Sequence, residues 1–144
     1  MPTGAISSFG TLVKKGDGGG TEVFTTIAEL LDIEGPEMEL DTEEATSHSS
    51  TEGWAEYLGT ILDAGEVSFE VNYIPTNATH NASTGLIKDM TARTRRNFQI
   101  VFPDAGNTTW SFAAFVTKVS PAMPVRGKLT GKFTLKLTGK PTLV

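Results

Sequence analysis

Apolar and polar residues alternate along several stretches of this chain. The clearest such stretch pairs apolar Val67, Phe69, Val71 and Tyr73 with polar Glu66, Ser68, Glu70 and Asn72. The same period of two continues in residues 98–102, 110–116 and 129–138. Alternation of this kind places one face of a β-strand in a core and the other in water or against a partner. We therefore predict strands in all four stretches.

The first part of the chain predicts a hairpin followed by a further extended segment. Residues 11–15 and 22–27 are short strand candidates that flank the glycine-rich run 16–20. Glycine accepts positive φ angles at little cost, so this run suits a hairpin loop. A phosphate-binding loop is disfavoured because no Gly-Lys-Ser/Thr follows. Residues 23–33 are interpreted as mostly strand, ending at Gly35-Pro36.

Helical spacing appears in two places. In residues 81–93, Asn81 or Ser83 is placed to cap a helix whose apolar stripe is Leu86, Ile87 and Met90. In residues 54–62 the apolar positions also have helical spacing, which predicts a short helix or an irregular turn.

Two segments carry few apolar side chains for a core. Residues 1–9 contain only Ile6 and Phe9 among small polar residues, which predicts a flexible N-terminal arm. Residues 38–53 are acidic and rich in hydroxyl groups, which predicts a long loop. Long loops in compact domains are usually functional or disordered.

These elements predict a mainly β fold, a β-sandwich or partly closed barrel with one flanking α-helix. The length of 144 residues and the absence of a repeat favour a single domain over residues 1–144.

Charge is distributed unevenly along the chain. Residues 1–87 contain fifteen acids and only two bases, Lys14 and Lys15, so their formal charge is −13. Residues 88–144 contain ten bases and two acids, so their formal charge is +8. Together they give the net charge of −5. Between Lys15 and Lys88 there is no basic residue. A subunit with opposite charges on different faces favours head-to-tail contacts, which close into rings or continue as filaments. A fold that interleaves the two parts would cancel this asymmetry.

No residue pattern indicates catalysis, a cofactor or a metal. The chain has no cysteine, and its two histidines, His48 and His80, lie in polar segments where exposed histidines are ordinary. No serine sits in a Gly-x-Ser-x-Gly motif, and the acids are too many and too dispersed to single out a catalytic pair. No apolar run approaches the roughly 20 residues that span a bilayer. We expect no cofactor, no membrane contact and no enzymatic activity.

The basic cluster Arg93, Arg95 and Arg96 lies at the C-terminal end of the predicted helix. A net charge of −5 argues against tight binding to a polyanion. We therefore favour ionic contacts between these arginines and the acidic part of another subunit over binding to nucleic acid.

The order of segments resembles the tail tube proteins, or major tail proteins, of long non-contractile phage tails. The resemblance covers most of the chain. It rests on residues 22–29, 33–36, 41–48, 53–57 and 62–69, on residues 98–103, and on the strand at Trp110 with the closing strand after it.

The resemblance implies a structural virion protein, made in the host cytoplasm, whose hexameric rings stack into a tube that phage DNA passes through. Its implied partners are other copies of itself, the tape measure protein, and tail initiator and terminator proteins. The N-terminal arm 1–9 and the loop 38–53 resemble segments that become ordered when rings stack. The candidate ring-stacking residues are Asp41, Thr42, Glu43, Glu44, Thr46, Ser47 and His48.

A channel for DNA favours an acidic or neutral lining, because a basic lining would hold the phosphates. DNA is then a molecule in transit, with no sequence-specific binding. The candidate lumen-facing residues are Glu66, Ser68, Glu70 and Asn72.

The main alternative is a monomeric β-sandwich that binds a carbohydrate or protein ligand. In that case exposed aromatic rings would form a stacking platform. The candidate rings are Trp54, Tyr57, Tyr73 and Trp110.

Overall fold

A computed structural model describes residues 3–143 of the chain; Met1, Pro2 and Val144 lie outside the described residues, and with them the first two residues of the predicted N-terminal arm. Seven antiparallel strands form one sheet in the order β2-β1-β7-β8-β9-β6-β3. These strands are β1 (Leu12–Gly16), β2 (Phe24–Thr26), β3 (Leu30–Glu34), β6 (Glu66–Asn72), β7 (Arg96–Val101), β8 (Thr109–Ala122) and β9 (Thr130–Leu143).

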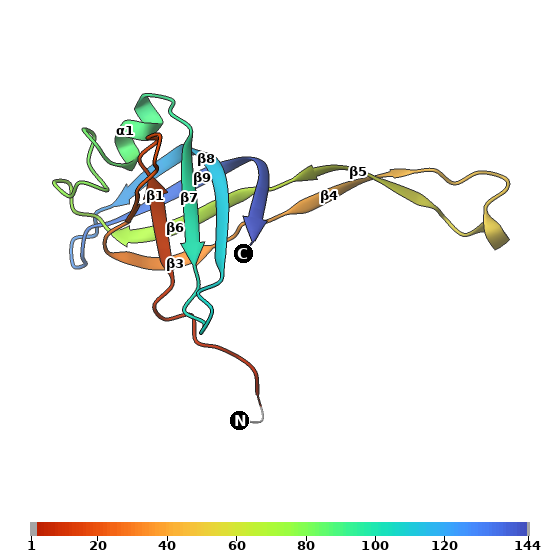
Figure 1. Cartoon of the computed structure of the whole chain (residues 1–144), viewed down its shortest axis with the longest axis horizontal. Helices are drawn as coiled ribbons and strands as arrows, with labels where there is room; N and C mark the ends of the chain where they lie inside the picture. The colour runs from red at the N-terminus through yellow and green to blue at the C-terminus, as the bar shows by residue number, and fades with distance from the viewer. Residues whose placement is uncertain (1–2, 144) are drawn as a thin grey trace.

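The large sheet curls so that its two edge strands are joined by a short connection (Figure 1). Residues 27–29 link β2 to β3 and bond to both sides: the Ile27 N–H donates to the Val13 carbonyl at 2.9 Å, and the Asn72 N–H donates to the Glu29 carbonyl at 2.9 Å. These bonds connect the two edges of the sheet. They also satisfy backbone groups of residues 27–29, which are not paired in a strand and need other hydrogen-bond partners. The prediction of a mainly β, partly closed barrel with one helix is confirmed.

The predicted alternation accounts for the core. In β6 the side chains of Val67, Phe69 and Val71 are buried, whereas the polar positions between them are exposed or half-buried. Phe69 stacks on Phe133 of β9, with ring centroids 5.7 Å apart. Aromatic pairs at this distance add to the stability that comes from burial alone.

The helix is shorter than the predicted range 81–93. It is α1 (Leu86–Thr91), and the buried Leu86 anchors it to the core. The Asn81 side chain accepts bonds from the backbone N–H groups of Thr84 at 2.8 Å and Gly85 at 2.9 Å. Asn81 thus closes a turn ahead of the helix instead of capping the helix itself, which explains the later start.

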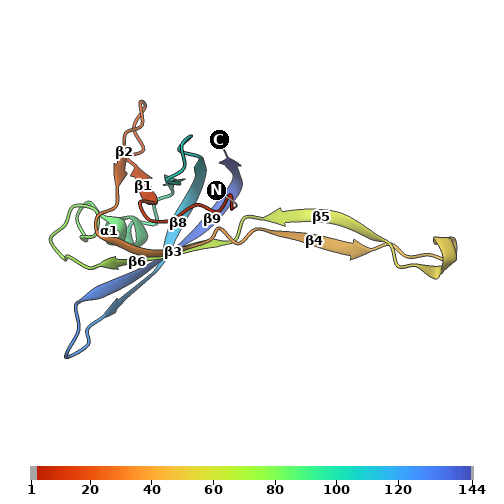
Figure 2. The ribbon, with the colours of Figure 1, turned by 90° about the horizontal axis from the view of Figure 1, so that it is seen from below.

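Residues 38–63 overturn two predictions. The loop predicted at 38–53 contains strand β4 (Glu39–Glu44) and a short 3-10 turn (Thr51–Gly53), and the helix or turn predicted at 54–62 is mainly strand β5 (Tyr57–Asp63). The two strands pair only with each other and extend away from the body (Figure 2). The prediction was wrong because neither face of this ribbon packs on the core, so no alternating pattern marks its strands.

One polar side chain inside the body was not expected there. His80, predicted to be exposed, is fully buried; its Nδ1 accepts from the Ile74 N–H at 3.2 Å and its Nε2 lies 2.8 Å from the Ala28 carbonyl. A backbone N–H only donates, so the ring proton is on Nε2 and donates to Ala28. His80 therefore ties the loop before α1 to the β2–β3 connection.

Candidate assembly surfaces

The ribbon formed by residues 39–63 is the most unusual surface of the molecule, and we call it the acidic arm. Every residue in it is exposed except Ser50, which is half-buried. It contains seven acids and no Lys or Arg, a formal charge of −7. A two-stranded hairpin is marginally stable in water at best, so a ribbon that packs on nothing is a candidate for contact with another molecule.

Large apolar side chains are exposed along the acidic arm. Leu40 and Leu62 face each other across the strands and are 51% and 77% exposed. The other exposed apolar side chains of the arm are Trp54, Tyr57, Leu58 and Ile61. Exposed apolar residues gathered on one element mark an interaction site.

The outer end of the acidic arm is ordered by its own hydrogen bonds. The Ala45 N–H donates to the Glu56 carbonyl at 2.7 Å, and the Glu56 N–H donates to the Thr46 hydroxyl at 2.9 Å. Ser50 donates its hydroxyl to the Glu56 carboxylate at 2.5 Å. Of the predicted ring-stacking residues, 41–44 lie on β4 and Thr46, Ser47 and His48 lie in the turn region beyond it.

The polar side of β6, proposed for the lumen, belongs to a broader polar face of the sheet. Across the β6–β9 ladder, Glu66 lies opposite Lys136 and Glu70 lies opposite Lys132. Directly opposite residues on one face of an antiparallel pair have Cβ atoms about 5 Å apart. Ser68 and Asn72 likewise lie opposite Thr134 and Thr130. Each acid of β6 thus has a base as its cross-strand neighbour.

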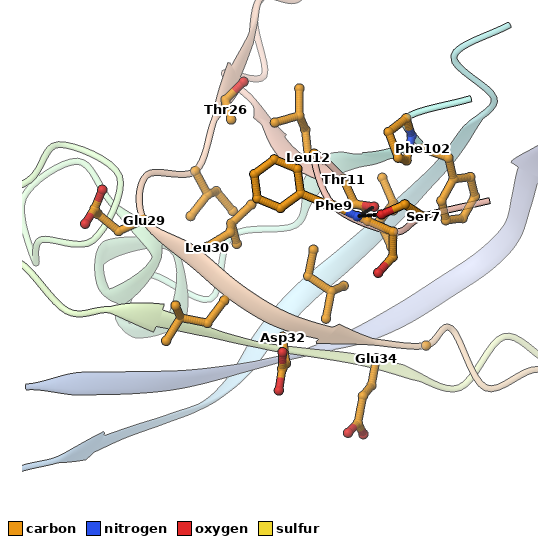
Figure 3. A pocket seen from close by; sticks show the side chains of 18 of the residues that line it. Ser7, Phe9, Thr11, Leu12, Thr26, Glu29, Leu30, Asp32, Glu34 and Phe102 are labelled. Atoms are coloured by element: carbon orange, nitrogen blue, oxygen red, sulfur yellow. Dashed lines mark hydrogen bonds between the residues drawn. The ribbon is translucent and has the colours of Figure 1, made fainter. Parts of the chain in front are cut away.

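The same polar face continues onto the strands at either side. On β3, Glu34 lies opposite Ser68, and Figure 3 shows Asp32 and Glu34 directed to one side of the strand. On β8, Lys118 lies opposite Thr134. The polar face therefore carries four acids, Asp32, Glu34, Glu66 and Glu70, and three bases, Lys118, Lys132 and Lys136. Its formal charge is −1, close to neutral.

Of the three arginines predicted to make contacts between subunits, Arg96 has partners inside its own subunit. Its Nε donates to the Asp89 carboxylate at 3.0 Å and its Nη1 donates to the Asp17 carbonyl at 2.7 Å. Asp89 is buried and also accepts from Lys15 at 2.8 Å. Arg93 and Arg95 are exposed.

The loop that Arg96 reaches is braced by Asp17. The Asp17 carboxylate accepts from the backbone N–H groups of Gly19 at 2.9 Å and Val23 at 3.3 Å. These backbone bonds, that from Gly19 first, lower the pKa of Asp17 because they stabilise its charged form. The glycine-rich run thus acts as the hairpin loop that was predicted.

A wide groove of about 1230 Å³ opens between β3, the start of β1 and the residues before it (Figure 3). Its lining includes Phe9, Leu12, Leu30 and Phe102. The Phe9 side chain is 92% exposed, so it does not fill the groove.

A second projection was missed by the sequence analysis. The connection of β8 to β9, residues 123–129, lies at the far end of the molecule from the acidic arm (Figures 1 and 2), and we call it the basic tip. It carries Arg126 and Lys128, no acid, and the exposed Met123 and Val125. The sequence feature that could have indicated a basic surface here is the absence of any acid after Asp104.

The aromatic residues proposed as a carbohydrate platform are not brought together. Tyr73 and Trp110 pack against the core of the body, whereas Trp54 and Tyr57 are exposed on the acidic arm. Among residues 3–143, no cluster of three or more His, Cys, Asp or Glu is arranged to hold a metal ion, and no helix has the length and apolar character of a membrane span.

A profile of the family described as lambda phage tail tube protein, TTP, matches residues 4–144. The chain belongs to this family. As a tail tube protein it is a structural component of the virion tail and not an enzyme. The resemblance identified from the sequence is confirmed. No curated protein matches the sequence.

Solved structures share the tail tube fold at low sequence identity. A chain from the tail of an empty GTA particle with C6 symmetry has a TM-score of 0.77 and 21% identity, over 97% of this chain and 99% of that one. A chain from the virion of a native gene transfer agent particle has a TM-score of 0.73 and 18% identity, over 97% and 99%. A chain from an extracellular contractile injection system, in a structure of the PVC sheath/tube terminator in the extended state, has a TM-score of 0.72 and 13% identity, over 100% and 99%.

Proposed function

We propose that this tail tube protein assembles into hexameric rings that stack into a tube, and that phage DNA passes through the tube. The observation that carries the proposal is the acidic arm, whose strands pack on nothing within the subunit and expose six large apolar side chains. Neighbouring copies would cover these side chains and supply the packing that an isolated ribbon lacks. The six-fold number is taken from the GTA tail of the same fold, which has C6 symmetry.

The polar face is the proposed lining of the channel. A face with four acids and three bases has little net attraction for phosphates, so DNA would slide along it. This refines the expectation for Glu66, Ser68, Glu70 and Asn72: the acids of β6 remain in the lining, and lysines of β9 lie beside them.

Further partners follow from the role in the tail. The partners that the family resemblance implies are a tape measure protein and tail initiator and terminator proteins. The proposed ring-stacking elements are residues 41–44 and 46–48 of the acidic arm and the N-terminal segment 1–9. Arg93 and Arg95 are proposed to make ionic contacts between subunits.

Sedimentation of the purified protein over a range of concentrations tests the proposal. We expect species far heavier than the 15.4 kDa subunit, in steps that correspond to rings and stacked rings. A protein that sediments as a monomer at every concentration, with or without an added tail initiator, would contradict the proposal and favour a monomeric binding module.

A further inference from the structure

We infer that the acidic arm of one subunit docks on the basic tip of a neighbouring copy. This inference rests on the proposed function, because it names the surface on which an arm proposed for stacking would lie. Both surfaces belong to the same chain, so one contact repeated between identical copies extends without limit along the tube.

Geometry excludes a contact within one subunit. The acidic arm extends from one end of the long axis and the basic tip lies at the other end, as both views of the ribbon show (Figures 1 and 2). A contact between two different surfaces at opposite ends is heterologous, and such contacts produce rings or filaments.

Charge selects the basic tip among the surfaces available. The arm carries −7 and the tip carries Arg126 and Lys128 without an acid. The wide groove is a poor site for the arm because none of its lining residues is Lys or Arg. The polar face is nearly neutral. Opposite charge steers encounter and disfavours wrong partners, so the tip is the surface that fits the arm.

Apolar exposure gives a second, independent reason. Met123 is 73% and Val125 fully exposed at the basic tip, and the acidic arm exposes Leu40, Leu58 and Leu62. Burying apolar side chains from both surfaces in one contact is favourable. Residues 75–114, which contain the exposed arginines Arg93 and Arg95, include no large exposed apolar residue.

Charge exchange between the two surfaces tests the inference. Glu43→Lys with Glu44→Lys reverses part of the arm, and Arg126→Glu with Lys128→Glu reverses the tip. We expect either pair alone to raise the protein concentration needed for tube formation about ten-fold or more, because like charges then face each other. All four substitutions in one chain should restore assembly toward the unsubstituted level.

Two control pairs make the outcome specific. Lys88→Glu with Lys140→Glu changes the net charge as the tip variant does, at exposed sites away from the tip, and should leave assembly nearly unchanged. Arg93→Glu with Arg95→Glu tests the competing surface. If reversal at Arg93 and Arg95 is rescued by the arm variant and reversal at the tip is not, the inference is overturned.

Cross-linking gives a readout independent of charge. The chain has no cysteine, so Ser49→Cys on the arm and Val125→Cys at the tip provide unique attachment points for a short bis-maleimide. Tubes of the double variant should yield a ladder of covalent multimers, whereas either single variant yields dimers at most. If tubes form normally, give no ladder and do not respond to the charge variants, the docking is overturned and the proposed function remains intact. If the unsubstituted protein forms no tubes, the proposed function itself is contradicted.

Discussion

At the scale of single residues, Asp89 holds together three elements, α1, β7 and the sequence-distant β1. Its carboxylate is buried between Lys15 of β1, at 2.8 Å, and Arg96 of β7, at 3.0 Å. Its own backbone belongs to α1, so the ion cluster fixes the helix against the sheet. Lys15 also donates to the Thr84 carbonyl at 3.0 Å, which extends the cluster to the turn before the helix.

We expect Asp89→Asn to lower the free energy of unfolding by about 3 kcal/mol, because removing one charge from a buried cluster leaves its partners uncompensated. Urea denaturation followed by circular dichroism measures the change. The matched control is Lys88→Gln, at an exposed position on the same helix, for which we expect little change. Equal stability of the two variants would show that the buried cluster contributes nothing to the fold.

Asp104, in the β7–β8 turn, is held by two hydrogen bonds from Thr108. Its carboxylate accepts from the Thr108 hydroxyl at 2.6 Å and from the Thr108 N–H at 2.7 Å. These bonds, the hydroxyl first, lower the pKa of Asp104 below its ordinary value. A carboxyl with a lowered folded-state pKa contributes stability above its unfolded pKa, and loses it as pH falls through the folded pKa.

Thr108→Val removes the hydroxyl donor, so we expect the pKa of Asp104 to rise toward its ordinary value. An NMR titration of the Asp104 carboxyl carbon measures this. Thr109→Val is the control, since the Thr109 hydroxyl donates to the Asn107 carbonyl and not to Asp104. An unchanged pKa in the Thr108 variant would contradict the assigned cause.

At the scale of elements, the acidic arm behaves as a unit separate from the core. Its base is fixed where Gly65, at φ +75°, joins β5 to β6, and a Cβ there would overlap the Glu37 carbonyl oxygen. Between residues 39 and 63 no side chain is buried in the body. The arm therefore adds little to the stability of the subunit and is available for contacts with other copies.

Glu39 and Asp63 lie opposite each other in the β4–β5 ladder. Replacing residues 40–62 by Asn-Gly therefore joins these two residues through a tight hairpin turn. We expect this variant to unfold at nearly the same temperature as the full chain, since it loses no core residue, and to form no tubes. Calorimetry and electron microscopy measure the two outcomes. Long tubes from the shortened chain would show that the arm is dispensable for stacking.

The elements that could be predicted from sequence are those that bury one face. The strands at Val67–Val71 and Phe98–Ile100 were identified by alternation because their apolar positions pack in the core. The arm strands escaped detection because pairing with each other, rather than burial, holds them in place. The candidate assembly surfaces were predicted only in part. Residues 41–48 were assigned to assembly by resemblance. The basic tip was not predicted, because its position follows from the topology of β8 and β9.

At the scale of the whole molecule, the uneven charge of the sequence is partly retained and partly cancelled. The polar face interleaves acids from residues 32–70 with bases from residues 118–136, which brings its formal charge to −1. The asymmetry survives at the two ends of the long axis, in the acidic arm and the basic tip. A nearly neutral face and oppositely charged ends fit the proposed function, in which DNA passes along the face and copies of the subunit bind to one another.

The neutral face gives a prediction for the channel. Glu66→Lys with Glu70→Lys would change its charge from −1 to +3, so tubes of this variant should retain duplex DNA in a sedimentation assay, whereas unsubstituted tubes should not. Glu66→Gln with Glu70→Gln, which gives +1, is the control and should retain much less. Equal retention by all three would contradict the placement of this face in the lumen.

Electron microscopy of the purified protein at high concentration tests the central claim most directly. Averaged end-on views should show rings of six subunits around an open channel, and side views should show the rings stacked into tubes. Lone, well-ordered subunits at every concentration, or closed particles without a channel, would contradict the account.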